Sequence, residues 1–305
     1  MKLVVARVPE RAAPVLALEC DGALYDVAEL EASPPGDDSA PARGLGAEFF
    51  CRVIAARCAG LAELEARVAS GLRPTEARLL DGRYLLLPPC AEGRAAYWQI
   101  RSAARGAPID FALRDARALA GDAQPVCVPD ALDERRFQVG LAAVLAEDLE
   151  HASAHEARRA LLGVTLIIDW GPACDEPSCG DARASHVHGA GGGALAPAHL
   201  GAQLAVGAVN ALFDLELEVK VGGVAQPPVV ARYRDLDAYE RIADLSRYAP
   251  LRAGDVIGLG PLALPSHAGT TSGTRVHRVG LGAPVEVRLG RALRLKGTAM
   301  RAREQ

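Results

Sequence analysis

The sequence predicts an α+β protein that is mainly β. Short apolar segments with alternating or continuous hydrophobic patterns recur along most of the chain, whereas helical spacing is confined to a few stretches. Only 4% of the residues are aromatic although 50% are hydrophobic, so the core must be built from leucine, valine, isoleucine and alanine. At 305 residues the chain is long enough for one large domain or two unequal ones.

The first elements are predicted to be two hairpins. Residues 3–7 and 15–18 form strands around a turn at Pro9-Glu10-Arg11, and Cys20-Asp21-Gly22 turns the chain into a further strand over residues 24–27.

A small N-terminal α/β domain is predicted to occupy residues 1–120. Apolar residues recur at helical spacing within 47–71, and Leu85-Leu86-Leu87 forms a short strand that stops at two prolines. Residues 104–126, rich in Ala, Arg and Gly, are expected to connect this domain to a second one over residues 121–305.

The second domain begins with two long apolar strands, over 138–145 and 164–168. A helix is expected between them, starting after Ser153, because Glu156 is placed for a capping box.

Later segments alternate strands with a short helix. Residues 171–197 form a long irregular segment, and loops of this length in compact domains are usually functional or disordered. Alternating apolar residues over 215–221 lead into a hairpin at Gly222-Gly223, residues 237–246 form a short helix, and residues 285–289 form the final strand.

Charge and composition exclude several classes of partner. The net charge of −4 and the pI near 6.0 give no general attraction to nucleic acid or to an anionic membrane surface. The start of the chain lacks a signal-peptide pattern, and no apolar run approaches the length of a membrane span, so a cytoplasmic protein is expected. The seven cysteines are expected to be free thiols.

Three stretches, in this order and spacing, carry a resemblance to a known family. They read FQVGLAAV over 137–144, GVTLIID over 163–169 and LRAGDVIGLGP over 251–261. Together they resemble the fumarylacetoacetate hydrolase family over roughly residues 125–298. The resemblance implies an FAH-like mixed β roll as the C-terminal domain and a protein that is commonly a homodimer.

The same resemblance implies a metal site from which ligands are missing. In the family, two glutamates and an aspartate hold Mg²⁺ or Ca²⁺, which stabilises an enolate formed from a β-dicarbonyl compound. Asp169 matches the aspartate, but Gln138 and Gly140 stand at the glutamate positions. The family's lysine and arginine are also absent, so metal-dependent chemistry is not expected, and no cofactor is predicted. A register shift to Glu134 would weaken this conclusion.

Other candidate site residues lie in or beside the long loop. His186 or His188 could act as an acid–base group with Asp169, or the glycine-rich loop could be a lid without a catalytic side chain. Zinc held by Cys174, Cys179 and the two histidines is a weaker alternative, since their spacing fits no standard zinc pattern and a flexible polar loop is favoured. A ligand pocket is expected to include Gln138, Trp170, Gly260 and His267.

Three functions are compatible with these residues. The first is a metal-independent enzyme of specialised, natural-product metabolism that cyclises, tautomerises or hydrolyses a small molecule or short peptide. The second is a non-catalytic protein that binds such a ligand. The third is a metal-dependent C–C hydrolase or decarboxylase of β-dicarbonyl acids that uses Mg²⁺ or Ca²⁺. The first is favoured, although fold alone does not determine activity.

Overall fold

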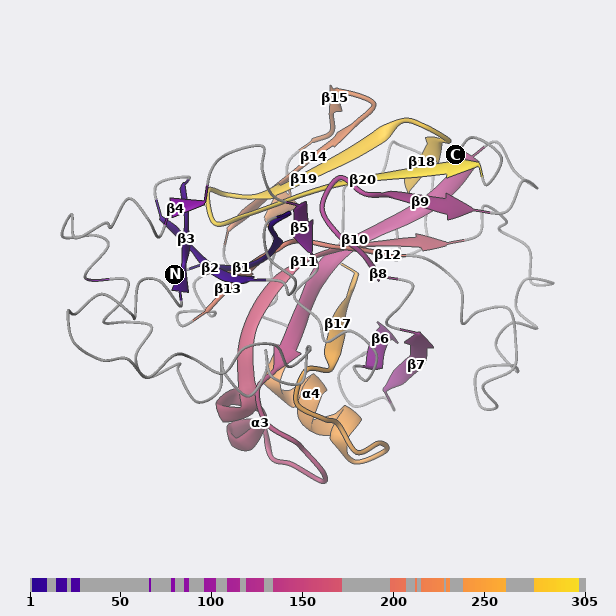
Figure 1. Ribbon diagram of the computed structural model, residues 1–305. Coiled ribbons are helices and arrows are strands. Elements are labelled where there is room, and N and C mark those ends of the chain that lie inside the picture. The colour runs from indigo at the N-terminus through magenta and orange to yellow at the C-terminus, as the bar shows by residue number, and fades with distance from the viewer. Residues whose placement is uncertain are drawn as a thin grey trace, which may run out of the picture.

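The computed structural model describes residues 2–9, 15–20, 23–27, 66, 78–79, 85–87, 96–102, 109–115, 119–128, 134–171, 198–206, 212, 215–227, 229–230, 238–261 and 277–301. Within these residues the chain forms a larger and a smaller β-sheet with two short helices (Figure 1).

The larger sheet has 14 described strands. They are β1 (Lys2–Arg7), β2 (Val15–Cys20), β3 (Ala23–Asp26), β4 (Arg78–Leu79), β5 (Leu85–Leu87), β6 (Ala96–Ser102), β7 (Asp110–Asp115), β8 (Leu119–Ala120), β10 (Glu134–Leu145), β11 (Leu161–Gly171), β12 (Ala198–Leu200), β13 (Gln203–Ala205), β17 (Val256–Pro261) and β18 (His277–Gly280). The smaller sheet contains β9 (Pro125–Val128), β14 (Glu216–Val221), β15 (Val224–Ala225), β16 (Val229–Val230), β19 (Pro284–Leu289) and β20 (Leu293–Arg301).

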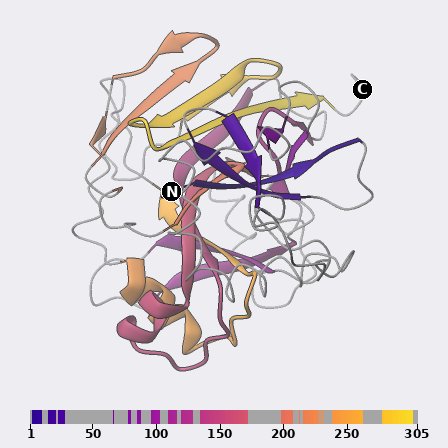
Figure 2. The same ribbon diagram turned by 60° about the vertical axis from the view of Figure 1, so that its left-hand side comes forward.

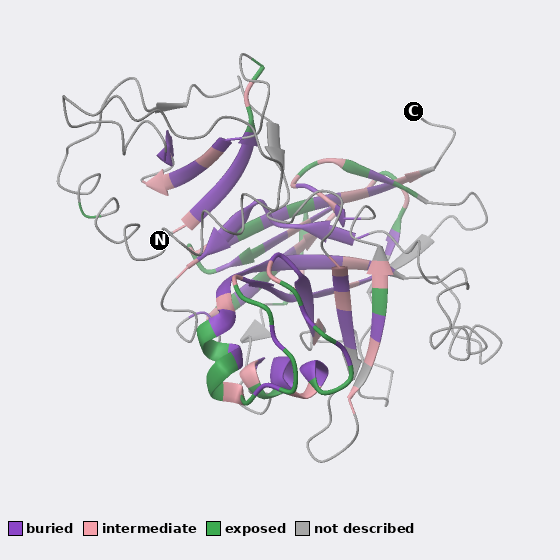
Figure 3. Ribbon diagram, turned by 60° about the horizontal axis from the view of Figure 1, so that its bottom comes forward, coloured by how far each residue is buried: buried purple, intermediate pink, exposed green. Residues whose placement is uncertain are grey.

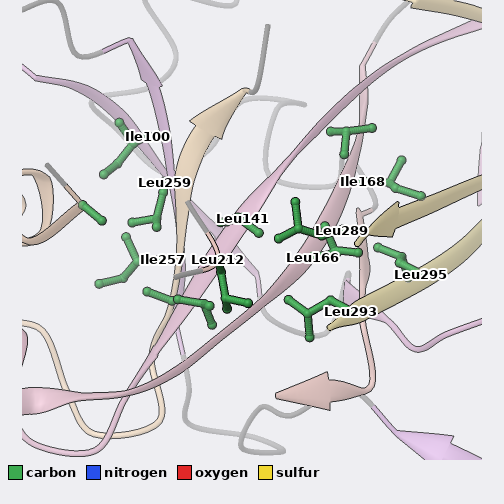
Figure 4. Close-up of a cluster of buried hydrophobic side chains, with 14 of the residues drawn as sticks. Ile100, Leu141, Leu166, Ile168, Leu212, Ile257, Leu259, Leu289, Leu293 and Leu295 are labelled. Atoms are coloured by element: carbon green, nitrogen blue, oxygen red, sulfur yellow. The ribbon is translucent and has the colours of Figure 1, made fainter. Parts of the chain in front are cut away.

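The antiparallel pair β10 and β11 forms the centre of the larger sheet, and β17 pairs with β10 on the side away from β11. Side chains alternate between the two faces of these strands. One face, which includes Leu141 and Leu166, packs with residues of β19 and β20 in the main hydrophobic core (Figure 4). The other face, which includes Ala142 and Ile167, packs with Leu3 of β1 in a second buried cluster. Both faces are therefore covered, as the continuous apolar runs of these strands require.

The smaller sheet lies across one end of β10 and β11, as two views of the ribbon show (Figures 1 and 2). The helices α3 (Ala154–Ala160) and α4 (Ala238–Ser246) pack together at the other end. The helix α3 buries Ala157 and Ala160 and exposes its outer residues (Figure 3).

Most of the elements expected from the sequence are confirmed. The strands β1, β2, β3 and β5 form as predicted, and so do the hairpin of β14 and β15, the helix α4 and the strand β19. The helix α3 begins with the predicted capping box, in which Ser153 and Glu156 bond each other's backbone N–H groups. The expected helix within 47–71 lies outside the described residues, except for Ala66.

The structure also contains strands that the sequence analysis does not predict, among them β6, β12 and β13. The stretch 104–126, which is expected to connect the two domains, contributes the strands β7 and β8, and β9 begins at its end. The strand β19 is not the last one, because β20 follows and pairs with it, with Leu293 and Leu295 on the core side. The division at residues 120 and 121 remains a prediction. Both α3 and α4 are far shorter than a bilayer-spanning helix, and the described residues contain no candidate span.

The turn before β17 fixes the position of β6. The buried carboxylate of Asp255 accepts hydrogen bonds from the backbone N–H groups of Ala96, at 2.8 Å, and Arg252, at 3.0 Å, and from Trp98 Nε1 at 3.1 Å. One side chain thus joins the turn to the first residues of β6, which then pairs in parallel with β17.

We expect Asp255→Ala to lower the free energy of unfolding by about 2 kcal/mol, because it leaves these donors without their acceptor. Urea unfolding measures the loss. The control is Asp148→Ala, since Asp148 also accepts from the same loop but is exposed. An equal loss in the two variants would contradict this role of Asp255.

Candidate functional site

The strand register places two of the predicted site residues, Gln138 and Asp169, on one face of the larger sheet, together with Gly140, which stands at a glutamate position of the family. Gln138 is paired with Asp169 across β10 and β11, and Gly140 follows two residues along β10. Residues two apart on a strand share a face, so Gln138 and Gly140 lie on the same side as Ala142, away from the main core. Glu134 lies four residues before Gln138 on β10, opposite Gly280 of β18, about 13 Å along the strand from the Gln138–Asp169 pair.

A tyrosine from β6 binds the carboxylate of Asp169. The Tyr97 hydroxyl donates to Asp169 Oδ1 at 2.6 Å. Tyr97 reaches this position because β6 runs parallel to β17, with Tyr97 opposite Val256. The ring is 1% exposed, and burial together with the charge of Asp169 raises the pKa of Tyr97 well above its ordinary value. Tyr97 is therefore a protonated donor at neutral pH.

Gln99 and Arg114 extend the hydrogen bonds around Asp169. Gln99, two residues after Tyr97 on β6, also bonds Asp169. The Gln99 side-chain oxygen accepts from Arg114 Nε at 3.0 Å and from Arg114 Nη2 at 2.6 Å. Because that oxygen is engaged by Arg114, the amide nitrogen of Gln99 is the group that donates to Asp169.

The pKa of Asp169 results from opposing effects. Burial raises it above the ordinary aspartate value, and the bonds from Tyr97 and Gln99 and the positive charge of Arg114 counteract that rise. The carboxylate, which belongs to a partly buried residue, is thus partly desolvated and is held by two donors and a nearby cation.

The neighbouring position on β10 is closed by the backbone of β17. Gly140 pairs with Pro261 and Ala142 pairs with Gly258, so three steps on β17 oppose two on β10, which is a β-bulge. Gly260 lies in this bulge with a φ of +96°, in the region that favours glycine. A Cβ atom built on Gly140 would lie 2.7 Å from the carbonyl oxygen of Gly260. The backbone of Gly260 therefore occupies the space that the Cβ atom of a larger residue at position 140 would need.

An arginine from α4 supports the bulge. Buried Arg241 donates through Nη1 to the carbonyl oxygen of Leu259. The same nitrogen would lie 2.6 Å from a Cβ atom built on Gly260. The bulge, α4 and the closed space at Gly140 thus form one packed unit.

Comparison with protein families identifies the chain. The family profile of the fumarylacetoacetate (FAA) hydrolase C-terminal region matches residues 90–296. The chain belongs to the fumarylacetoacetate hydrolase family. No curated protein sequence matches it.

Solved structures of similar fold span the whole chain. Maleylpyruvate hydrolase from Sphingobium sp. SYK-6, in complex with manganese(II) and pyruvate, has a TM-score of 0.67 and 16% identity, covering 99% of each chain. Fumarylacetoacetate hydrolase from Exiguobacterium antarcticum has a TM-score of 0.68 and 15% identity, again over 99% of each chain. A 2-hydroxyhepta-2,4-diene-1,7-dioate isomerase from Mycobacterium marinum has a TM-score of 0.64 and 16% identity, with the same coverage. At these identities the likeness establishes the fold.

The described residues do not fit the divalent cation that the family implies. A hard cation prefers several oxygen ligands, most of them charged. At this place Asp169 is bound by Tyr97 and Gln99, its neighbour across the strands is the neutral Gln138, and Gly140 has no side chain and no room for one. Among the described residues, no group of three or more His, Cys, Asp or Glu side chains could hold a metal ion.

Several predicted site residues are not brought to this face. The proposed acid–base residues His186 and His188, the pocket residue His267 and the alternative zinc ligands Cys174 and Cys179 lie outside the described residues. Trp170 is described, but it packs in the main core on the opposite face of the sheet and is 3% exposed. Its ring nitrogen donates to His199 Nδ1 at 2.7 Å.

Tyr97, Gln99 and Arg114 were missed by sequence reasoning. The run Ala96-Tyr97-Trp98-Gln99-Ile100 has the aromatic and β-branched character of a strand, which could have revealed β6. The sequence holds no signal that pairs β6 with β17. The paired residues Tyr97 and Val256 are about 160 positions apart in the chain.

Proposed function

We propose that this member of the fumarylacetoacetate hydrolase family is a metal-independent enzyme of specialised, natural-product metabolism. It would cyclise, tautomerise or hydrolyse a small molecule or short peptide by acid–base catalysis. The observation that carries the proposal is the environment of Asp169, a carboxylate bound by the Tyr97 hydroxyl at 2.6 Å and lacking a second carboxylate across the strand at Gln138.

In this proposal Asp169 is the catalytic base. Burial raises the pKa of Asp169 and so brings it nearer to the pH at which proton transfer is efficient. Asp169 would take a proton from the substrate and return it to a neighbouring atom. Tyr97 stays protonated and orients the carboxylate, because its hydroxyl is buried. His186 or His188 remains the proposed second acid–base group, and Gln138, Gly260 and His267 remain the proposed pocket residues.

A metal-dependent hydrolase or isomerase is the second candidate. It is favoured by the manganese ion in the maleylpyruvate hydrolase structure, which has the same fold. The donor set around Asp169 argues against it, because hydrogen-bond donors surround this carboxylate where further oxygen ligands would be required. A homodimer is proposed from the family alone.

The test uses pyruvate, the ligand of that relative, as a probe of proton abstraction. We expect the wild-type protein, stripped with EDTA, to exchange the pyruvate methyl protons in D₂O, as followed by ¹H NMR. Asp169→Asn should lower the exchange rate by about 10²-fold or more, since it removes the base.

The matched control is Asp148→Asn, an exposed carboxylate that should leave the rate unchanged. Exchange that requires added Mn²⁺ or Mg²⁺, with the metal found at stoichiometric content by elemental analysis, would favour the metal-dependent hydrolase. Exchange equally slow in wild type and Asp169→Asn would contradict the assignment of Asp169 as a base and favour a ligand-binding protein.

A further inference from the structure

We infer that the chain's own hydrogen-bond donors occupy the place of a cation at Asp169, with Arg114 supplying the positive charge through Gln99. The inference deepens the proposed function, and rests on it, by naming the residues that make a metal unnecessary. Tyr97, Gln99 and Arg114 thereby become positioning residues, because they act on a substrate only through Asp169.

The Asp169 carboxylate is bound by donors of the chain itself. A buried carboxylate is costly unless hydrogen bonds and an opposite charge compensate for its lost hydration. In a metal site the cation does this. Here the Tyr97 hydroxyl binds Oδ1 at 2.6 Å, and the Gln99 amide adds a second donor.

Arg114 is the source of the positive charge. Arg114 of β7 donates two hydrogen bonds to the Gln99 side-chain oxygen, from Nε at 3.0 Å and from Nη2 at 2.6 Å. These two bonds fix both the position and the orientation of the amide. The Arg114 guanidinium is near enough to act on both Asp169 and Tyr97 electrostatically. The hairpin of β6 and β7 therefore delivers one positive charge and two neutral donors to one carboxylate.

The missing glutamates change the charge at the site. A site with two glutamates and one aspartate holds three negative charges around a divalent cation. At Gln138 and Gly140 both glutamate charges are absent, so removing the cation along with them leaves Asp169 as the carboxylate on which Tyr97, Gln99 and Arg114 act.

The test is a double-mutant cycle on stability. Arg114→Met is made in the wild-type chain and in the Asp169→Asn chain, and the unfolding equilibrium of all four proteins is measured in urea at pH 7.5. We expect Arg114→Met to shift the equilibrium toward the unfolded state about tenfold more in the wild-type background than in the Asp169→Asn background. A purely packing role of Arg114 would give equal shifts in both backgrounds and would overturn the inference.

The controls separate the possible failures. Arg252→Met, which removes an exposed guanidinium paired with Asp148, should show no coupling to Asp169→Asn. If Arg114→Met folds only when Asp169→Asn is also present, Arg114 and Asp169 are strongly coupled and the inference is supported. If it folds in neither background, Arg114 is required independently of Asp169 and the inference fails. Tight binding of Mn²⁺ by the wild-type protein, measured by EPR, would instead contradict the metal-independent function, whatever the cycle shows.

Discussion

Replacing Gly140 by glutamate, which restores the residue type of the family, is expected to prevent stable folding instead of restoring a metal site. The first side-chain atom would lie 2.7 Å from the Gly260 carbonyl oxygen, closer than such contacts occur, and a further carboxylate would be buried there. Overpacking and an unpaired buried charge together cost more than about 4 kcal/mol. Gln138→Glu changes only a partly buried side chain and should be tolerated far better.

Soluble yield and urea unfolding check this expectation. Gly140→Ala isolates the steric part and should lose about 1–3 kcal/mol of unfolding free energy. The matched control is Gly280→Ala, another strand glycine, because a Cβ atom there would meet nothing within 4 Å. If Gly140→Glu folded as well as wild type and bound Mn²⁺, the closed space at this position would be disproved.

Acidification is expected to destabilise the protein through His199. This histidine is fully buried between the ring nitrogen of Trp170 and the backbone carbonyl of Gln124. Burial lowers the pKa of His199 from 6.5 to about 4. Its contribution to stability is therefore fully present above pH 6.5 and is lost as the pH falls to about 4. The free energy of unfolding falls by about 3 kcal/mol over this range, since each pKa unit corresponds to about 1.4 kcal/mol.

The comparison of wild type with His199→Gln isolates this effect. Burial raises the pKa of Asp169, Asp255 and Asp122, whose contributions change in the opposite sense, but those groups are present in both proteins. Urea unfolding between pH 7.5 and 4 should show a steeper loss in wild type than in His199→Gln. His155→Gln, an exposed histidine, should keep the wild-type slope. Parallel pH profiles for wild type and His199→Gln would show that His199 is not the group that titrates.

The position of His199 also shows why local patterns did not reveal its role. From the sequence it was one polar residue at the end of a loop rich in titratable groups. In the structure it lies on β12, and a Cβ atom at Gly297 would approach its ring to within 2.7 Å. The ring is therefore enclosed by β11, β20 and the segment just before β9, three separate parts of the chain, and such enclosure has no signature in a local window.

Local chemistry predicted the elements well. The alternation over 215–221, the Ser153 capping box and the apolar runs of β10 and β11 each specify their structure through interactions within a few residues. The face shared by Gln138, Gly140 and Asp169 follows from the two-residue period of a strand, once the two strands are paired. The closed space at Gly140 could not be predicted, because it depends on the bulge at Gly260 of β17.

The parallel pairing of β6 with β17 affects how the protein folds during its synthesis. On one side β6 pairs with β7, and on the other with β17, which is synthesised about 160 residues later. During translation, Tyr97 and Asp169 both leave the ribosome well before the strand that brings them together. Contacts of such long sequence separation form slowly, because the intervening chain must first be ordered. Shortened or stalled chains that end before Val256 would expose the edge of β10, which makes them prone to aggregation.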